Sequence, residues 1–203
     1  MKLTILNYKG GQGKSLIAHQ LITTFGYKGY EFDPYGSLTL RLPDDVTFIE
    51  IDAKKIGSKY DDKIIFDFGG FAHQLEEEAI SESDLVIIPF VPVLESVQGT
   101  LEMLPKIIPH LIKYDTPLLF VPNMAAKEKD EREALNLFRD EFEMEIDYYS
   151  IPYLVGLQTA INENVSVSKL AKNGGFSGMP YRKSNKIIQS LHEKILEYDP
   201  KNF

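Results

Sequence analysis

The stretch Tyr8–Ser15 reads YKGGQGKS and lies between a short apolar segment and a longer apolar run with helical spacing. Its glycines leave backbone N–H groups unobstructed, so the loop can wrap around an anion, and the start of the following helix attracts negative charge. Lys14 can reach terminal phosphates, and the Ser15 hydroxyl can hold Mg²⁺. A turn rich in glycine and lysine is often only a flexible loop, but its place between strand and helix predicts nucleotide binding.

The loop departs from the usual pattern GxxxxGK[ST] at its first position. Tyr8 stands there instead of glycine, and a second lysine, Lys9, follows it. From chemistry alone, a second lysine beside the phosphates would raise the local positive potential.

A loop of the form KGGxGK[ST] with two lysines resembles the deviant Walker A loop of the ParA/MinD ATPases, the superfamily of plasmid and chromosome partition proteins. YEFDPYG (30–36) is similar to that family's second acidic motif, with Glu31 in place of the first aspartate. KIIFDFGG (63–70) is similar to its Walker B strand, and the stretch 81–104 to the strand and helix that follow. Ile151–Pro152, with Leu157 and Ala160, resembles the segment that lies against the base.

The resemblance implies a weak intrinsic ATP hydrolase that uses ATP and Mg²⁺. It implies an ATP-dependent homodimer with two nucleotides between the subunits, in which Lys9 crosses to the nucleotide of the facing subunit. It also implies non-specific DNA binding in the ATP state and a centromere-binding partner that stimulates hydrolysis. The expected location is the cytoplasm, on the nucleoid when ATP is bound.

The catalytic residues are predicted to be Lys9, Lys14 and Asp33. Asp33 ends a strand and is expected to orient the attacking water, although Asp-Pro-Tyr-Gly is also a good turn sequence and both roles can hold at once. Asp67 ends another apolar strand and is expected to hold Mg²⁺ with Ser15, partly through water; the alternative is a plain loop carboxylate. The predicted nucleotide-binding residues are Lys9, Gly10, Gly11, Gln12, Gly13, Lys14, Ser15, Leu16, Asn123 and Pro152.

Two of these residues keep open alternatives. Asn123 follows an apolar strand and would either contact the adenine edge or be a turn residue beside proline. Pro152 would either pack on the base or end a strand. The four histidines lack metal-ligand spacing, so core or surface roles are expected for them.

Composition favours one globular domain spanning residues 1–203. With 203 residues, 43% of them hydrophobic, the chain can bury one substantial core. The absence of cysteine excludes a disulfide framework, a thiolate zinc site and a cysteine-ligated iron–sulfur cluster. Neither a secretory signal nor a membrane span is expected, because no apolar run approaches ~20 residues. The net charge of −8 argues against a uniformly basic nucleic-acid coat.

Charge is uneven along the chain. Acids outnumber bases between Lys127 and Asp147, where a solvated face is expected, whereas no acid lies between Glu163 and Glu193. That acid-free window contains the predicted DNA-binding residues, for which a solvated face is the alternative: Lys169, Lys172, Arg182, Lys183 and Lys186. The apolar residues of 187–196 have helical spacing, and nearby acids disfavour an anionic membrane, so packing on the sheet and no stable membrane contact are expected.

Strand and helix patterns alternate, which predicts an α/β fold: a single doubly wound, mostly parallel sheet with helices on both faces, as in P-loop NTPases of the ParA/MinD type. Strands are expected near 2–7, 29–33, 46–51, 63–68, 85–89, 117–122 and 147–151. Helices are expected near 14–26, 73–82, 96–114, 128–142, 160–172 and 183–198. Pro105 and Pro109 would bend or split the third helix. The stretch 34–62 is expected to be a loop with one short strand.

Three other functions remain alternatives. A MinD-like positioning ATPase would share the loop but bind membrane through its C-terminus. A P-loop biosynthetic synthetase would transfer phosphate to a small acid instead of water. A pseudo-ATPase scaffold would bind nucleotide without turnover, against which the presence of Asp33 and Asp67 argues.

Overall fold

The computed structural model describes residues 1–50, 52–56, 62–71, 73–173 and 175–202. Its centre is a seven-stranded sheet of order β3-β2-β4-β1-β5-β6-β7, in which all neighbouring strands are parallel. The strands are β1 (Lys2–Ile5), β2 (Lys28–Glu31), β3 (Val46–Phe48), β4 (Ile64–Asp67), β5 (Leu85–Phe90), β6 (Leu118–Ala125) and β7 (Ile151–Pro152). The chain starts in the middle of the sheet and adds strands on both sides, which confirms the predicted doubly wound α/β fold.

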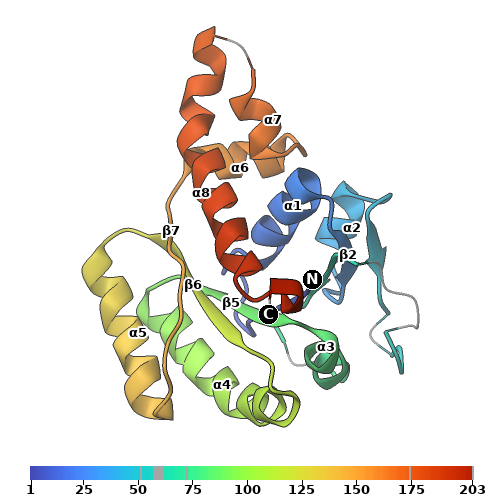
Figure 1. Ribbon diagram of the computed structural model, residues 1–203, viewed down its shortest axis with the longest axis vertical. Coiled ribbons are helices and arrows are strands. Elements are labelled where there is room, and N and C mark those ends of the chain that lie inside the picture. Colours follow the sequence, from blue (N-terminus) through green and yellow to red (C-terminus); the bar gives the residue numbers. More distant parts are fainter. Residues whose placement is uncertain (51, 57–61, 72, 174, 203) are drawn as a thin grey trace.

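Helices cover both faces of the sheet (Figure 1). They are α1 (Lys14–Phe25), α2 (Ser37–Arg41), α3 (Glu76–Glu82), α4 (Leu94–Tyr114), α5 (Glu128–Phe142), α6 (Val155–Asn162), α7 (Val167–Ala171) and α8 (Met179–Leu196), with short 3₁₀ turns at Gly175–Gly178 and Pro200–Asn202. One apolar core joins α1, α6, α7 and α8 to the sheet, and a second core joins α3, α4 and α5 to the opposite face. Successive strand residues alternate between these cores: Ile64 belongs to the second and Ile65 to the first.

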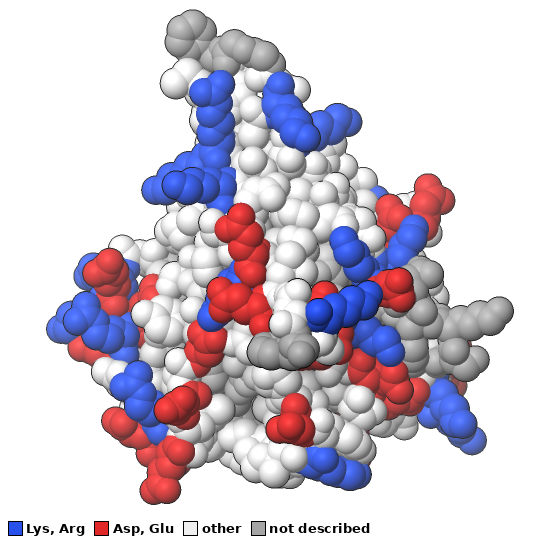
Figure 2. Space-filling view, viewed as in Figure 1, with Lys and Arg blue, Asp and Glu red and all other residues white. Residues whose placement is uncertain are grey.

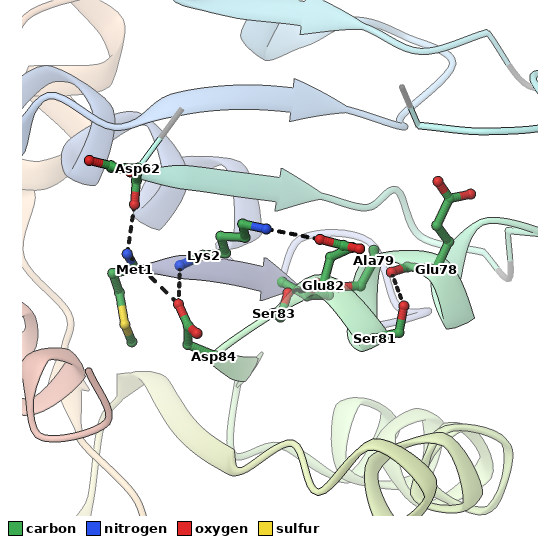
Figure 3. A network of polar contacts seen from close by, with 10 residues as sticks. Met1, Lys2, Asp62, Glu78, Ala79, Ser81, Glu82, Ser83 and Asp84 are labelled. Carbon is green, nitrogen blue, oxygen red and sulfur yellow. Dashed lines mark hydrogen bonds and ion pairs between the residues drawn. The ribbon is translucent and has the colours of Figure 1, made fainter. Parts of the chain in front are cut away.

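Polar contacts fix the start of β1 against its neighbours (Figure 3). The Lys2 backbone N–H donates to the Asp84 carboxylate at 2.6 Å, and the Lys2 ammonium donates to Glu82 at 2.8 Å. The Thr4 and Ser83 hydroxyls share a hydrogen bond of 2.8 Å. These contacts hold the central strand, whose other end carries the glycine-rich loop.

The stretch 34–62 contains the unpredicted helix α2 in addition to the predicted short strand, although residues 51 and 57–61 lie outside the described part. The buried Glu31 carboxylate accepts the backbone N–H groups of Leu38 and Thr39, at 2.8 and 2.7 Å. One side chain from the end of β2 thus satisfies two N–H groups of the first turn, which short helices otherwise leave without partners. The longer glutamate side chain has a structural task at the position where the family usually has aspartate.

The single helix predicted over 160–172 is wrong, because the structure has two helices there. Asn164 adopts a left-handed conformation, with φ of 53°, which ends α6. The Ser166 hydroxyl then accepts the Lys169 N–H at 3.1 Å and caps the start of α7. The α6 helix also begins earlier than predicted, at Val155.

Pro105 and Pro109 do not split α4, which runs without interruption from Leu94 to Tyr114. The two prolines are four residues apart, so they share one face of the helix, and both are exposed. The carbonyl groups that lose their intrahelical partners therefore lie toward water, which can hydrogen-bond them.

Replacing Glu31 by alanine should lower the free energy of unfolding by about 2 kcal/mol or more, because two N–H groups of α2 lose their buried acceptor. Thermal and urea unfolding measure the change. The control is Glu82→Ala, which removes an exposed ion pair and should cost less than about 1 kcal/mol. Equal losses in the two variants would show that the carboxylate of Glu31 does not stabilise α2.

Candidate nucleotide-binding site

The glycine-rich loop leaves the end of β1 at the carboxyl edge of the sheet and leads directly into α1. Gly11 and Gly13 have φ values of 77° and 92°, a left-handed conformation that side chains other than glycine rarely adopt. A side chain on Gly10 would meet open space. The loop therefore presents its backbone to solvent at the place where doubly wound folds bind ligands.

The side chain of Gln12 fixes the loop to β5 and α4. Its Oε1 atom accepts the backbone N–H of Val91 at 2.8 Å and the hydroxyl of Ser96, and its Nε2 atom donates to the Gly10 carbonyl at 3.0 Å. The sequence predicts that Gln12 binds nucleotide. Its side chain is buried and braces the loop, so the predicted contact would be made by its backbone.

Asn123 holds the loop by a hydrogen bond to its backbone. It lies within β6, so the turn role considered for it is wrong. Its Nδ2 donates to the Gln12 carbonyl at 2.9 Å. A Cβ on Gly13 would lie only 2.1 Å from the same nitrogen, so glycine at position 13 is required by the close approach of Asn123 as well as by its φ angle.

Lys14 opens α1 with its side chain folded back under the loop. It is only 7% exposed, and its ammonium donates to the Lys9 carbonyl at 3.2 Å. Burial lowers the pKa of Lys14, while the charges of Asp67 and Asp33 act in the opposite direction. The contact with Lys9 uses one of the three donors of the ammonium, and an anion in the loop would be within its reach.

Asp67 ends β4 and is fully buried beside Lys14. Its carboxylate lies next to the Ser15 hydroxyl, but in the part of the chain that the structure describes neither carboxylate oxygen has a hydrogen-bond partner of good geometry. Burial raises the pKa of Asp67 to about 7, with smaller contributions from Glu31 and Asp33, whereas the Ser15 hydroxyl and the Lys14 charge lower it. A buried carboxylate without partners, next to a hydroxyl, fits oxygen coordination of Mg²⁺ or of its bound water.

Asp33 follows β2 and its side chain closes a turn. Oδ1 accepts the N–H of Tyr35 at 3.0 Å, and the Asp33 carbonyl accepts the N–H of Gly36 at 2.9 Å. A Cβ on Gly69 would lie 3.3 Å from the Asp33 Cα atom, so the segment after β4 passes close to this turn. Asp33 therefore has the turn role that its sequence suggested, at a position near Lys14 and Asp67.

Lys9 lies at the surface, and the aliphatic part of its side chain lies near Gly99 of α4. A Cβ atom added to Gly99 would be 3.6 Å from the Cβ atom of Lys9. The surrounding hollow is lined by side chains of both charges, including Glu95, Glu102 and Lys106. Lys9 thus presents its charge outside the loop, whereas Lys14 is beneath it.

Tyr8 and Glu76 form a contact that sequence reasoning missed. The Tyr8 hydroxyl donates to Glu76 Oε2 at 2.5 Å, and Glu76 Oε1 accepts the His73 N–H at 2.6 Å. Burial raises the pKa of Glu76, and its hydrogen bonds lower it. The departure of Tyr8 from the glycine pattern was the available signal, but its partner is far away in the sequence. The contact joins the start of the loop to α3.

Three of the predicted nucleotide-binding residues come together beside the loop. Leu16, Asn123 and Pro152 line one small hollow, together with Tyr153 and Leu157. Pro152 also ends β7, so the strand-ending role considered for it is correct. It lines this hollow as well. The apolar hollow thus adjoins the glycine-rich loop, to which Asn123 is hydrogen-bonded.

The five predicted DNA-binding residues lie away from the loop, on α7 and the first half of α8 and next to them. All five side chains are exposed. Figure 2 shows lysine and arginine side chains gathered on the protruding upper end of the molecule, with no acidic side chain among them in that view. No ion pair involves these five residues within the described part of the chain.

No protein-family model matches the chain, and no curated protein matches it. Solved structures do. An aspartate-to-alanine variant of McdA from Cyanothece, in complex with ATP, superposes with a TM-score of 0.62 at 17% identity, over 94% of this chain and 96% of McdA. MinD with Mg-ADP from Pyrococcus horikoshii gives 0.57 at 15%, over 98% of each chain. ParA of pnob8 gives 0.58 at 13%, over 100% of this chain and 99% of ParA. The fold is therefore that of the ParA/MinD ATPases, as the sequence resemblance indicated.

Asp67→Asn should change how the stability of the nucleotide-free protein depends on pH. The folded pKa of about 7 lies above the ordinary value of 3.8, so the ionised carboxylate destabilises the fold above pH 7, and this cost disappears as the pH falls toward 4. At pH 8 the variant should be more stable than the original protein by on the order of 4 kcal/mol, and at pH 4 the two proteins should be similar.

Urea unfolding at pH 4, 6 and 8 measures this effect. Asp84→Asn, which changes a partly exposed carboxylate at the other edge of the sheet, is the control. A variant whose unfolding free energy parallels that of the original protein at all three pH values would contradict the assignment of a destabilising charge to Asp67.

Proposed function

We propose that this protein is a ParA-type partition ATPase, which binds ATP with Mg²⁺, dimerises around the nucleotide, binds DNA without sequence preference and hydrolyses ATP when a centromere-binding partner stimulates it. The observation that carries the proposal is the buried pair of Lys14 and Asp67 beneath a loop with two left-handed glycines. The fold shared with McdA, MinD and ParA supports it.

The proposed mechanism divides the site into three tasks. The backbone of the loop and the Lys14 ammonium bind the phosphates, while Ser15 and Asp67 hold the metal. Mg²⁺, when bound, neutralises charge that develops on the phosphate oxygens. One Asp33 oxygen is used by its turn, and the second orients the attacking water. Hydrolysis is slow until the partner completes the site.

Lys9 is proposed to act on the nucleotide of a facing subunit. Its side chain is exposed at the rim of the loop, whereas Lys14 fills the position beneath the loop of its own subunit. A second cation supplied across an interface would stabilise the charge of the transition state, as an arginine finger does. Such a dimer forms only when nucleotide is present, so ATP controls which state of the protein is populated.

DNA is the proposed ligand of the surface formed by Lys169, Lys172, Arg182, Lys183 and Lys186, which we call the basic protrusion. The burial of α8 favours DNA over a membrane as the ligand. The apolar residues Ile188, Leu191 and Ile195 of α8 are fully buried in the core on the α1 side of the sheet. They are therefore not available to enter a bilayer, which a membrane-binding amphipathic helix requires. No helix in the described residues is long and apolar enough to span a membrane. Location on the nucleoid in the ATP state follows from the proposed DNA binding.

The two lysines of the loop should differ in the step that they affect. Lys14→Ala should weaken ATP binding by about a hundredfold or more, because the phosphates lose a buried counterion. Lys9→Ala should bind ATP within about threefold of the original affinity but remain monomeric. Isothermal titration calorimetry and analytical ultracentrifugation measure the two properties. An ATP-dependent dimer of Lys9→Ala would refute its role in trans, and full ATP affinity of Lys14→Ala would remove the nucleotide site.

Replacement of Arg182, Lys183 and Lys186 by alanine should weaken DNA binding equally on unrelated duplexes. The slope of log K against log salt should become shallower by about 0.9 for each phosphate that is no longer neutralised. In a dimer the effect on affinity should be larger, because the DNA contact of the second subunit is then intramolecular. Fluorescence anisotropy with ATP at several salt concentrations measures this slope. The matched control removes three exposed α5 charges, Lys129, Arg132 and Arg139. If both triple variants lose affinity equally, the protrusion is not the DNA-binding surface.

A further inference from the structure

A large hollow lies at the end of the sheet opposite the glycine-rich loop, where β6 begins. Its walls are the end of α4 with the start of β6 (108–118), the segment 142–147 after α5, and Tyr198, and its volume is about 850 Å³. We call it the acidic groove. Because it lies where β6 begins, it is remote from the phosphate loop at the other ends of the strands. A dimer formed through the nucleotide would leave it open.

The floor of the acidic groove is apolar. Leu111 is buried there, while Phe142, Met144 and Ile146 are partly buried and pack on the core beneath. Ile112, which also lines the hollow, is 75% exposed and extends this apolar surface to solvent. Adjoining apolar side chains in a concave surface are typical of binding sites for other proteins.

The rim of the groove carries four acids, Asp115, Glu143, Glu145 and Asp147. Asp147 forms an ion pair with Lys194 at 2.8 Å. Within the described residues, no ion pair involves Asp115, Glu143 or Glu145. An apolar floor with unneutralised acids around it is complementary to an apolar segment that carries positive charge.

Two of these acids occupy positions that disfavour them. Asp115 and Glu143 follow the last residues of α4 and α5 with φ values of 53° and 49°, where glycine or asparagine is the common residue. Each also places negative charge at the negative end of a helix dipole. Glycine at either position would remove both costs, so these acids do not serve the stability of their helices.

We propose that the acidic groove binds a positively charged amphipathic helix of a partner protein. A second copy of this chain does not offer such a helix: α8 is basic and amphipathic, but its apolar face is buried in its own core. The partner helix places apolar side chains at i, i+3, i+4 and i+7 on the floor and its lysines or arginines against the rim. This site is separate from the proposed nucleotide and DNA sites, and its occupation does not require ATP.

The test uses the full chain and a fluorescent peptide of about 18 residues, roughly five helical turns, with leucine on one face and lysine elsewhere. The control peptide replaces every lysine by glutamine. The lysine peptide should bind the protein at least about tenfold more tightly than the glutamine peptide in anisotropy measurements without nucleotide. Similar affinities for the two peptides, or no binding of the lysine peptide, would overturn the proposal.

Variants of the protein distinguish binding of the lysine peptide in the groove from its general attraction to a negatively charged protein. Glu143→Lys with Glu145→Lys should weaken binding of the lysine peptide by about tenfold or more, whereas Glu128→Lys with Glu133→Lys, the same charge change elsewhere on α5, should change it less than about threefold. Ile112→Ser should weaken binding although it changes no charge. Equal effects of the two double variants, or an unchanged affinity of Ile112→Ser, would show that the peptide does not use the groove.

Two further measurements control for folding and for self-association. Glu143→Gly should raise the melting temperature, because glycine suits the left-handed position, and should still weaken peptide binding, so this loss cannot come from unfolding. Sedimentation without nucleotide should show a monomer. A dimer that Glu143→Lys with Glu145→Lys disrupts would assign the groove to a second copy of the chain and overturn the proposal.

Discussion

The structure buries two opposite charges close together, the Lys14 ammonium and the Asp67 carboxylate, and in the described residues they form no ion pair with each other. The Lys14 ammonium contacts a loop carbonyl, and the carboxylate of Asp67 is fully buried next to the Ser15 hydroxyl, with no hydrogen bond of good geometry in the described residues. Water solvates such groups well, so burying them costs free energy that only a ligand of complementary charge can recover. The left-handed glycines and the bonds of Gln12 and Asn123 matter because they keep an open place for that ligand above the two charges.

Much of the fold could be predicted from local sequence, and two exceptions, α2 and the division between α6 and α7, share one cause. Unbroken apolar runs identified most of the strands, since parallel strands are buried on both faces. The strand predicted near 147–151 is displaced in the structure, where β7 is Ile151–Pro152. The helix α2 was missed because it depends on Glu31, whose carboxylate accepts two of its N–H groups from an earlier strand. The division between α6 and α7 depends on the left-handed Asn164, whose amide also donates to the Arg41 carbonyl at 2.6 Å. In each case a distant contact overrides local propensity.

The candidate site shows the same limit. The motifs identified the loop, Asp33 and Asp67 because residue type and spacing carry their chemistry. They did not reveal that Gln12 acts through its side chain as a brace, or that Tyr8 contacts Glu76, because those partners lie far away in the sequence. The acidic groove is beyond local patterns altogether: its floor and rim come from the ends of two helices and from the C-terminal segment, and their acids read as an ordinary solvated face.

The bracing of the glycine-rich loop has a consequence for how the protein folds. The contacts that shape the loop come from Val91 and Ser96, after β5, and from Asn123 in β6, at sequence separations of 79, 84 and 111 residues. The loop can therefore reach the conformation seen here only after β5 has joined β1 and β6 has joined β5, and contacts of such separation form slowly. If nucleotide binds as proposed, it would bind the assembled sheet and not the partly folded chain, and would therefore stabilise the completed fold by mass action. In a refolding experiment, the recovery of nucleotide binding would report the docking of β5 and β6.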